Sequence, residues 1–183
     1  SDVDRVLEEI RKLLEDLKRH SEKVSEENED LLRANTELNK RVSEDNERLL
    51  EELKRLRERG GISEEDLKRA LDRVRKTVET VKEENKRSLE DVRRTVETNK
   101  RKLERVVEEI KKLIEDAKRR GSGDERDHMV LHEYVNAAGI TIDRLLETSD
   151  RSLEKVEADL RRLNEELDRS LERAERTIRE LAK

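Results

Sequence analysis

The chain is marked first by what it lacks. Its 183 residues include no Pro, Cys, Trp or Phe, one Met, one Tyr and five Gly. Without cysteine, the redox compartment cannot be inferred from the sequence. No apolar run approaches transmembrane length, and no signal-peptide pattern is present. No Gly-rich phosphate loop or nucleophile motif occurs, and the carboxylates recur with Lys and Arg three or four residues on, as on solvated helix faces. The sequence therefore predicts neither an enzyme nor a cofactor site.

Charge dominates what is present. Charged residues make up 51% of the chain and hydrophobic residues 31%. The apolar share is below the roughly 45–50% of globular domains and close to the two-in-seven seam of a coiled coil. The formal net charge is −5 with the signs interspersed, which argues against nucleic acid and membrane surfaces as partners. Because the apolar residues are periodic, we expect a soluble all-α protein and not a disordered one, with no localisation assigned.

Two glycine breaks, Gly60-Gly61 and Gly121-Ser122-Gly123, divide the chain into three similar lengths. Ser63 and Asp124 stand where helix N-caps are expected. Turns this short place neighbouring helices antiparallel. The sequence thus predicts a single domain over residues 1–183, an all-α, antiparallel, up-down-up three-helix bundle of long, nearly straight helices. The expected helices are 2–59, 63–120 and 124–182.

Short motifs recur at an offset of eighteen residues within each expected helix. The repeated pairs are Val24–Leu32 with Val42–Leu50, Thr77–Thr80 with Thr95–Thr98, and Asp150–Glu154 with Asp168–Glu172. Eighteen residues are about five whole turns, so this period keeps helices nearly straight where a heptad would supercoil them.

Folding the chain at its turns brings repeated polar residues level with one another. Asn28 then lies opposite Thr95 and Asn46 opposite Thr77, and two serines of the last helix fall into the same two layers. Because buried polar groups without partners cost roughly 1–3 kcal/mol each, we expect two copies of one interhelix hydrogen-bond network. Its expected members are Asn28, Asn46, Thr77, Thr95, Ser152 and Ser170, with Asn35, Asn85, Ser88 and Asn99 as candidates to extend it. The alternative, that some of these residues face water, is disfavoured because the polar positions coincide on three helices.

These copied polar layers resemble computationally designed helical bundles with programmed hydrogen-bond networks. In style the chain is similar to the cage-and-latch switches among those designs, although no motif identifies a parent. The resemblance implies a protein that changes state on binding, with a designed key helix as one conceivable partner.

Residues Arg126–Thr141, reading RDHMVLHEYVNAAGIT, differ from the rest of the chain; we call them the insert. They hold the only Met, the only Tyr and two of the three His. Several of them favour strands over helices. Extending the eighteen-residue repeat backward places an apolar helical stripe here, with Tyr134 in a layer with Ile10 and Leu113. We therefore expect the insert to be helical, with a caging core of Leu131, Val135, Ala138 and Ile142.

The same insert resembles the last strand of the green fluorescent protein barrel, in the engineered form used as a split-reporter tag. The likeness covers all sixteen residues from Arg126 to Thr141. It implies that Met129, Leu131, Glu133 and Val135 face the barrel interior, with Glu133 toward the chromophore. The implied partner is the truncated barrel that lacks this strand. Since the rest of the barrel is absent, the chain cannot fluoresce alone.

The helical and extended forms exclude each other, so the sequence predicts a monomeric bundle that cages the strand and can donate it. One alternative is an interaction scaffold, in which the three helices accept a fourth helix or self-associate. Another is a bundle that carries the tag for detection only. His128 and His132 have metal-ligand spacing but no third convergent ligand, so no metal site is expected. His20 is expected to be a boundary residue.

Overall fold

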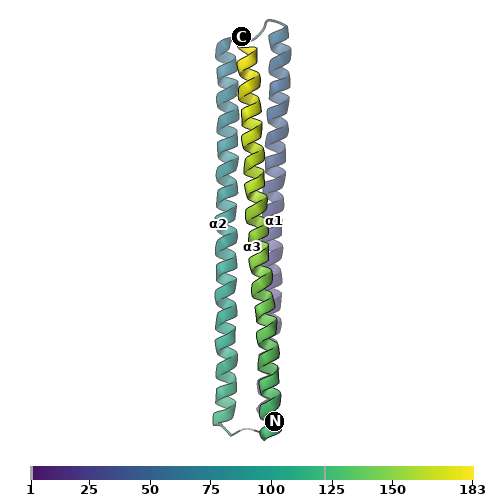
Figure 1. Ribbon diagram of the computed structural model, residues 1–183, viewed down its shortest axis with the longest axis vertical. Coiled ribbons are helices and arrows are strands. Elements are labelled where there is room, and N and C mark those ends of the chain that lie inside the picture. The colour runs from purple at the N-terminus through teal and green to yellow at the C-terminus, as the bar shows by residue number, and fades with distance from the viewer. Residues whose placement is uncertain (1, 122) are drawn as a thin grey trace. The chain divides into compact units, whose positions relative to one another are not determined.

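Three α-helices make up the fold, in a computed structural model that describes residues 2–121 and 123–183. They are α1 (Asp2–Glu58), α2 (Glu64–Arg119) and α3 (Glu125–Leu181). Figure 1 shows that consecutive helices run antiparallel, in an up-down-up order. The all-α three-helix bundle is therefore confirmed, and each predicted helix limit lies within one residue of the observed one. Ser122, in the second glycine break, lies outside the described residues.

The chain divides into two compact units, and each unit takes a stretch from all three helices. Unit 1 comprises the chain up to Asn28 together with Val92–Glu154. Unit 2 comprises Glu29–Asp91 and Lys155–Lys183. The insert lies wholly in unit 1. The prediction of a single domain stays a prediction.

Both loops between helices end in an N-terminal capping box. At the start of α2, the Asp66 N–H donates to Ser63 Oγ at 3.1 Å, and the Ser63 N–H donates back to Asp66 Oδ2 at 3.3 Å. At the start of α3, the Asp127 N–H donates to Asp124 Oδ1 at 2.9 Å, and the Asp124 N–H donates to Asp127 Oδ2 at 3.2 Å. Each box satisfies N–H groups that the first helical turn leaves unpaired.

The C-terminus of α1 is closed by a glycine whose backbone lies in the left-handed region. Gly60 has a φ of 71°. Its N–H donates to the Arg57 carbonyl at 3.0 Å, and the Gly61 N–H donates to the Leu56 carbonyl at 2.9 Å. This pair of bonds is the Schellman arrangement, which a residue with a Cβ enters at a steric cost.

Each unit has its own apolar core. Except for Ile62, which is in the loop before α2, the core residues recur at helical spacing on one face of each helix. The buried core of unit 1 consists of Val3, Val6, Ile10, Leu17, Leu103, Val106, Ile110, Ile114, Ala117, Leu131, Ala138 and Ile142. The buried core of unit 2 consists of Val42, Leu50, Leu53, Ile62, Leu67, Val74, Val78, Val81, Leu167, Ala174 and Ile178.

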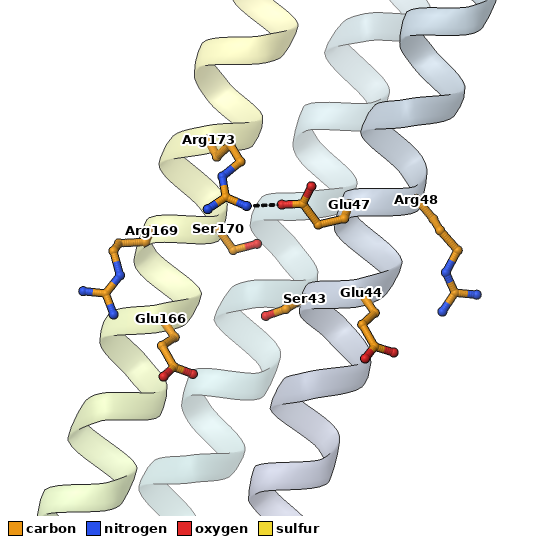
Figure 2. A pocket seen from close by; sticks show the side chains of 8 residues that line it. All are labelled: Ser43, Glu44, Glu47, Arg48, Glu166, Arg169, Ser170 and Arg173. Atoms are coloured by element: carbon orange, nitrogen blue, oxygen red, sulfur yellow. Dashed lines mark hydrogen bonds and ion pairs between the residues drawn. The ribbon is translucent and has the colours of Figure 1, made fainter.

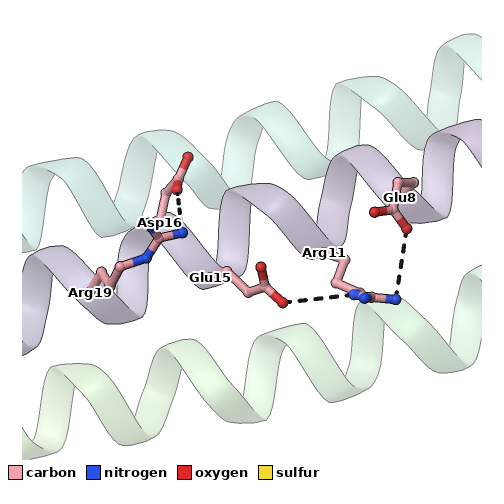
Figure 3. Close-up of polar contacts among 5 residues, drawn as sticks. All are labelled: Glu8, Arg11, Glu15, Asp16 and Arg19. Atoms are coloured by element: carbon pink, nitrogen blue, oxygen red, sulfur yellow. Dashed lines mark hydrogen bonds and ion pairs between the residues drawn. The ribbon is translucent and has the colours of Figure 1, made fainter.

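The opposite faces of the helices carry charge. On α1, Arg11 lies 3.7 Å from both Glu8 and Glu15, and Arg19 lies 3.1 Å from Asp16 (Figure 3). Exposed pairs at this spacing contribute only about 0.3–0.5 kcal/mol each. Apolar burial, and not charge pairing, therefore holds the helices together. Among the described residues, no helix combines the length and hydropathy needed to cross a membrane.

Candidate functional site

The insert forms the first four and a half turns of α3, at its N-terminal end. All of Arg126–Thr141 is α-helical, as the eighteen-residue register predicted. It follows directly after the second turn and its capping box. No residue of the insert is extended, so the edge that a barrel would pair with is not formed in this state.

One face of the insert, continued by Ile142 directly after it, is buried in the core of unit 1. Leu131 is 0% exposed, Ala138 2% and Ile142 3%. They belong to one cluster with α1 residues such as Ile10 and α2 residues such as Ile110. The predicted stripe is thus buried against both other helices at three of its four positions.

At the fourth position, Val135, the structure differs from the prediction. Val135 is half-buried and packs against the edge of the core. Its counterparts eighteen and thirty-six residues later, Leu153 and Leu171, are half-buried as well. The three positions related by the repeat therefore have the same degree of burial, as the repeat predicts. The prediction failed because it placed the position in the core when it lies at the border of the apolar stripe.

The other face of the insert presents apolar side chains to solvent. Met129 is 66% exposed, Ile140 55% and Val130 40%. Arg126 and Glu133 are exposed too. Three of the four large hydrophobic residues that are exposed among the described residues thus lie in the insert. A sequence chosen only to form a helix in this bundle has no need of them.

The residues that the resemblance assigns to the barrel interior are split by the helix. Leu131 is buried and Val135 half-buried, whereas Met129 and Glu133 are exposed. Thr141, at the end of the insert, is half-buried, and its hydroxyl donates to the Ala137 carbonyl at 3.1 Å. In a strand, side chains two residues apart share one face. In this helix they do not, so all four cannot meet one partner surface until the helix unwinds.

In the insert, the cost of forming a helix and the gain from burying apolar side chains are of similar size. Its poor helix formers cost about 4 kcal/mol relative to alanine. Burial of Leu131 and Ile142 contributes about 1.5–3 kcal/mol each. The two terms nearly offset one another, so tertiary packing decides whether this segment stays helical. A loss of packing in unit 1 should release it.

Gly139 gives a direct test of that helical conformation. A Cβ added at Gly139 meets no heavy atom of the described residues within 4 Å, and the residue is not among the glycines with positive φ. We expect Gly139→Ala to stabilise the protein by about 1 kcal/mol, because alanine is the better helix former. In a protein of this size the expected rise in Tm is about 2–4 °C.

The matched control is Gly60→Ala. A Cβ there also meets open space, but Gly60 has a φ of +71°. A side chain in that region costs about 1–2 kcal/mol, so Tm should fall. Thermal melts followed by circular dichroism compare the two variants. A lower Tm for Gly139→Ala would mean that position 139 is not helical in solution.

The predicted hydrogen-bond network needs a larger correction. Of its six residues, three are buried and three half-buried: Asn28, Asn46 and Ser170, then Thr77, Thr95 and Ser152. Within the described residues, the amide nitrogens of Asn28 and Asn46 have no hydrogen-bond partner. The Thr77 hydroxyl donates to the Arg73 carbonyl of its own helix at 2.8 Å, which uses its single proton locally. The predicted network is therefore wrong at Asn28, Asn46 and Thr77, whose donors form no bond between helices, and it stays a prediction at the other three residues.

Other asparagines form the buried interhelix bonds. In unit 2, Asn85 Nδ2 donates to Asn164 Oδ1 at 2.8 Å and to Asn39 Oδ1 at 3.2 Å. Asn39 Nδ2 returns a bond to Asn85 Oδ1 at 2.9 Å. In unit 1, Asn99 Nδ2 donates to Ser21 Oγ at 3.3 Å. Asn85 and Asn99 were among the candidates named to extend the network, whereas Asn39 and Asn164 were missed because neither belongs to a repeated motif. Aligning the helices at their turns does bring Asn39, Asn85 and Asn164 within about two residues of one level.

A hollow of about 550 Å³ lies between α1 and α3 in unit 2. Figure 2 shows the side chains that line it. Ser43 and Ser170 lie at its centre, and Arg173 forms an ion pair with Glu47 across it. Its remaining lining is Glu44, Arg48, Glu166 and Arg169. Because glutamates and arginines alternate around this hollow, it carries no concentrated charge of one sign that would select a ligand.

Two of the three histidines lie one helical turn apart, and the third is in another helix. His128 is half-buried and His132 exposed, both in the insert. Over the described part of the chain, no group of three or more His, Cys, Asp or Glu side chains is placed to hold a metal ion. His20 is half-buried in α1; burial lowers the pKa of its imidazole, and the ammonium groups of Lys102 and Lys23 lower that pKa further.

Comparison with known proteins gives little. No protein-family model and no curated protein matches this chain. Among solved structures, a chain described as a computationally designed three helix bundle is similar, with 15% sequence identity and a TM-score of 0.46. The likeness covers 98% of this chain and 87% of that one. The fold assignment rests on the three helices described above.

Proposed function

We propose that the chain is a designed three-helix bundle that holds a split fluorescent-protein strand as a helix and can donate it to the truncated barrel. The observation that carries this proposal is the burial of Leu131, Ala138 and Ile142 inside unit 1. Leu131 also belongs to the barrel-facing set that the resemblance implies. One side chain cannot fill both sites at once, so the bundle and the barrel compete for the insert.

Strand addition supplies the driving force for donation. An added strand pairs its backbone with an exposed sheet edge and buries alternate side chains in the partner. The bundle opposes this reaction, because only molecules with an opened insert can bind. Apparent affinity for the barrel is reduced by the fraction of open molecules. The exposed Met129, Val130 and Ile140 support the proposal, since they are suited to a strand and bury little in the bundle.

The experiment mixes the intact protein with the ten-strand barrel fragment and follows fluorescence against time. The reference is a free peptide with the sequence of Arg126–Thr141 at the same concentration. For an opening free energy of about 3 kcal/mol, we expect complementation to be roughly 150-fold slower than with the peptide. Equal rates for protein and peptide would show that the insert is a detection tag and is not caged.

A further inference from the structure

The turn that precedes the insert is fastened to the start of α1, through what we call the clasp. The clasp consists of two contacts to α1, an ion pair and a close approach of the backbone, together with the Asp124–Asp127 capping box, which holds the turn to the first turn of α3. In the ion pair, Arg120 Nε donates to Asp2 Oδ2 at 3.1 Å. At the close approach, Gly123 has a φ of +86°, and a Cβ built on it would lie 2.9 Å from Val3 Cγ2.

Beyond the clasp, little holds the first part of α3. None of the residues from Glu125 to Val130 is buried. The first buried side chain of α3 is Leu131. The other end of the insert is different, because Ala138 and Ile142 are buried there and Leu145 and Leu146 pack against the same core. Helix ends with few buried contacts open most easily, so the two ends of the insert should differ in local stability.

Accessibility to a partner is uneven in the same direction. Met129, at the clasp end, is the most exposed large hydrophobic residue among the described ones, at 66%. It belongs to the barrel-facing set, as does the exposed Glu133. A barrel can therefore touch this end while Leu131 is still in the bundle core. Once the first turn unwinds, the freed backbone N–H and C=O groups become available for pairing.

We propose that strand donation begins at the turn before α3, that opening proceeds from Asp124 toward Ile142, and that the clasp is the gate. This inference rests on the proposed function and adds a direction and a control point to it. Breaking the clasp at its capping box should increase the open population of the insert's first half without changing any residue of the insert. The same break at the other capping box should leave the insert unaffected.

The test uses Asp124→Ala, with Ser63→Ala as its matched control. Both substitutions remove the side chain of an N-cap in a capping box, the first in unit 1 and the second in unit 2. Amide hydrogen exchange is measured on the intact protein alone. Loss of an N-cap should raise the opening equilibrium by about 2- to 30-fold. We expect that increase in residues 126–135 for Asp124→Ala, and no change there for Ser63→Ala.

Complementation is then measured for the same two variants. An acceleration by Asp124→Ala that matches its exchange factor supports the gate. The gate is overturned if exchange of residues 126–135 is unchanged, if exchange rises equally along all of α3, or if faster exchange leaves complementation unaltered. Failure of the proposed function gives a different result. The unsubstituted protein would then complement the barrel fragment as fast as the free peptide, whatever the exchange data show.

Discussion

Ile10→Ala should remove most of the retardation that the bundle imposes on complementation. Ile10 is 0% exposed and lies in the same core cluster as Leu131, Ala138 and Ile142. Truncating a buried isoleucine to alanine costs about 2–5 kcal/mol, through lost burial and the cavity left behind. The opening equilibrium of the insert should rise by the corresponding factor, about 30-fold or more, until the rate of the free peptide limits it. Because Ile10 is in α1, the donated strand keeps its sequence.

The matched control is Ile178→Ala. Ile178 is 4% exposed and belongs to the core of unit 2. Its loss should lower the free energy of unfolding by a similar amount, yet leave complementation nearly unchanged if the insert opens locally. Chemical denaturation measures the first effect, and fluorescence with the ten-strand fragment measures the second. Equal acceleration by both variants would mean that the strand escapes through global unfolding, and no acceleration by Ile10→Ala would mean that the core does not cage it.

The helices were predictable because their limits are encoded locally. Ser63 and Asp124 sit at N-caps, and Gly60 occupies a left-handed position that ends α1. These signals act over a few residues and need no knowledge of the partner helices. The division of the contacts into two units was not predictable, because no break in the sequence coincides with it.

The buried stripe of the insert was predictable for a different reason. Eighteen residues are close to five turns, so a position and its eighteen-residue counterpart face the same direction. Leu131 and its counterparts eighteen and thirty-six residues later, Ser149 and Leu167, are 0%, 7% and 0% exposed. Ala138 and its counterparts Val156 and Ala174 are 2%, 3% and 0% exposed. The depth of a border position such as Val135 depends on how far the neighbouring helices reach around it, which a single sequence does not encode.

Hydrogen-bond partners were the least predictable feature. Equal height along the bundle is necessary for two side chains to pair, but it does not fix their rotamers. Thr77 illustrates this, because its hydroxyl reaches the carbonyl of its own preceding turn at 2.8 Å. That bond competes with any partner on another helix, as it does for threonines in helices generally. An asparagine, with two donors and an acceptor on a longer side chain, reaches across more readily.

Because some buried asparagines are hydrogen-bonded and others are not, alanine substitution should change the free energy of unfolding in opposite directions at the two kinds of site. Asn85 is 1% exposed and bonds to Asn39 and Asn164, whereas Asn46 is 5% exposed and its amide nitrogen has no partner within the described residues. Asn85→Ala should lower the free energy of unfolding by about 2–4 kcal/mol, since it removes these bonds and leaves buried acceptors unpaired. Asn46→Ala should raise it by about 0.5–2 kcal/mol, because it removes an unpaired buried donor and improves helix propensity.

Both asparagines lie in unit 2, so denaturation midpoints compare the two variants within one core. Both substitutions remove the same atoms, and packing lost with the side chain is common to the pair. The difference between them therefore isolates the hydrogen bonds. If Asn46→Ala destabilises as much as Asn85→Ala, the Asn46 amide has a partner in solution, such as a buried water, and this layer is satisfied after all.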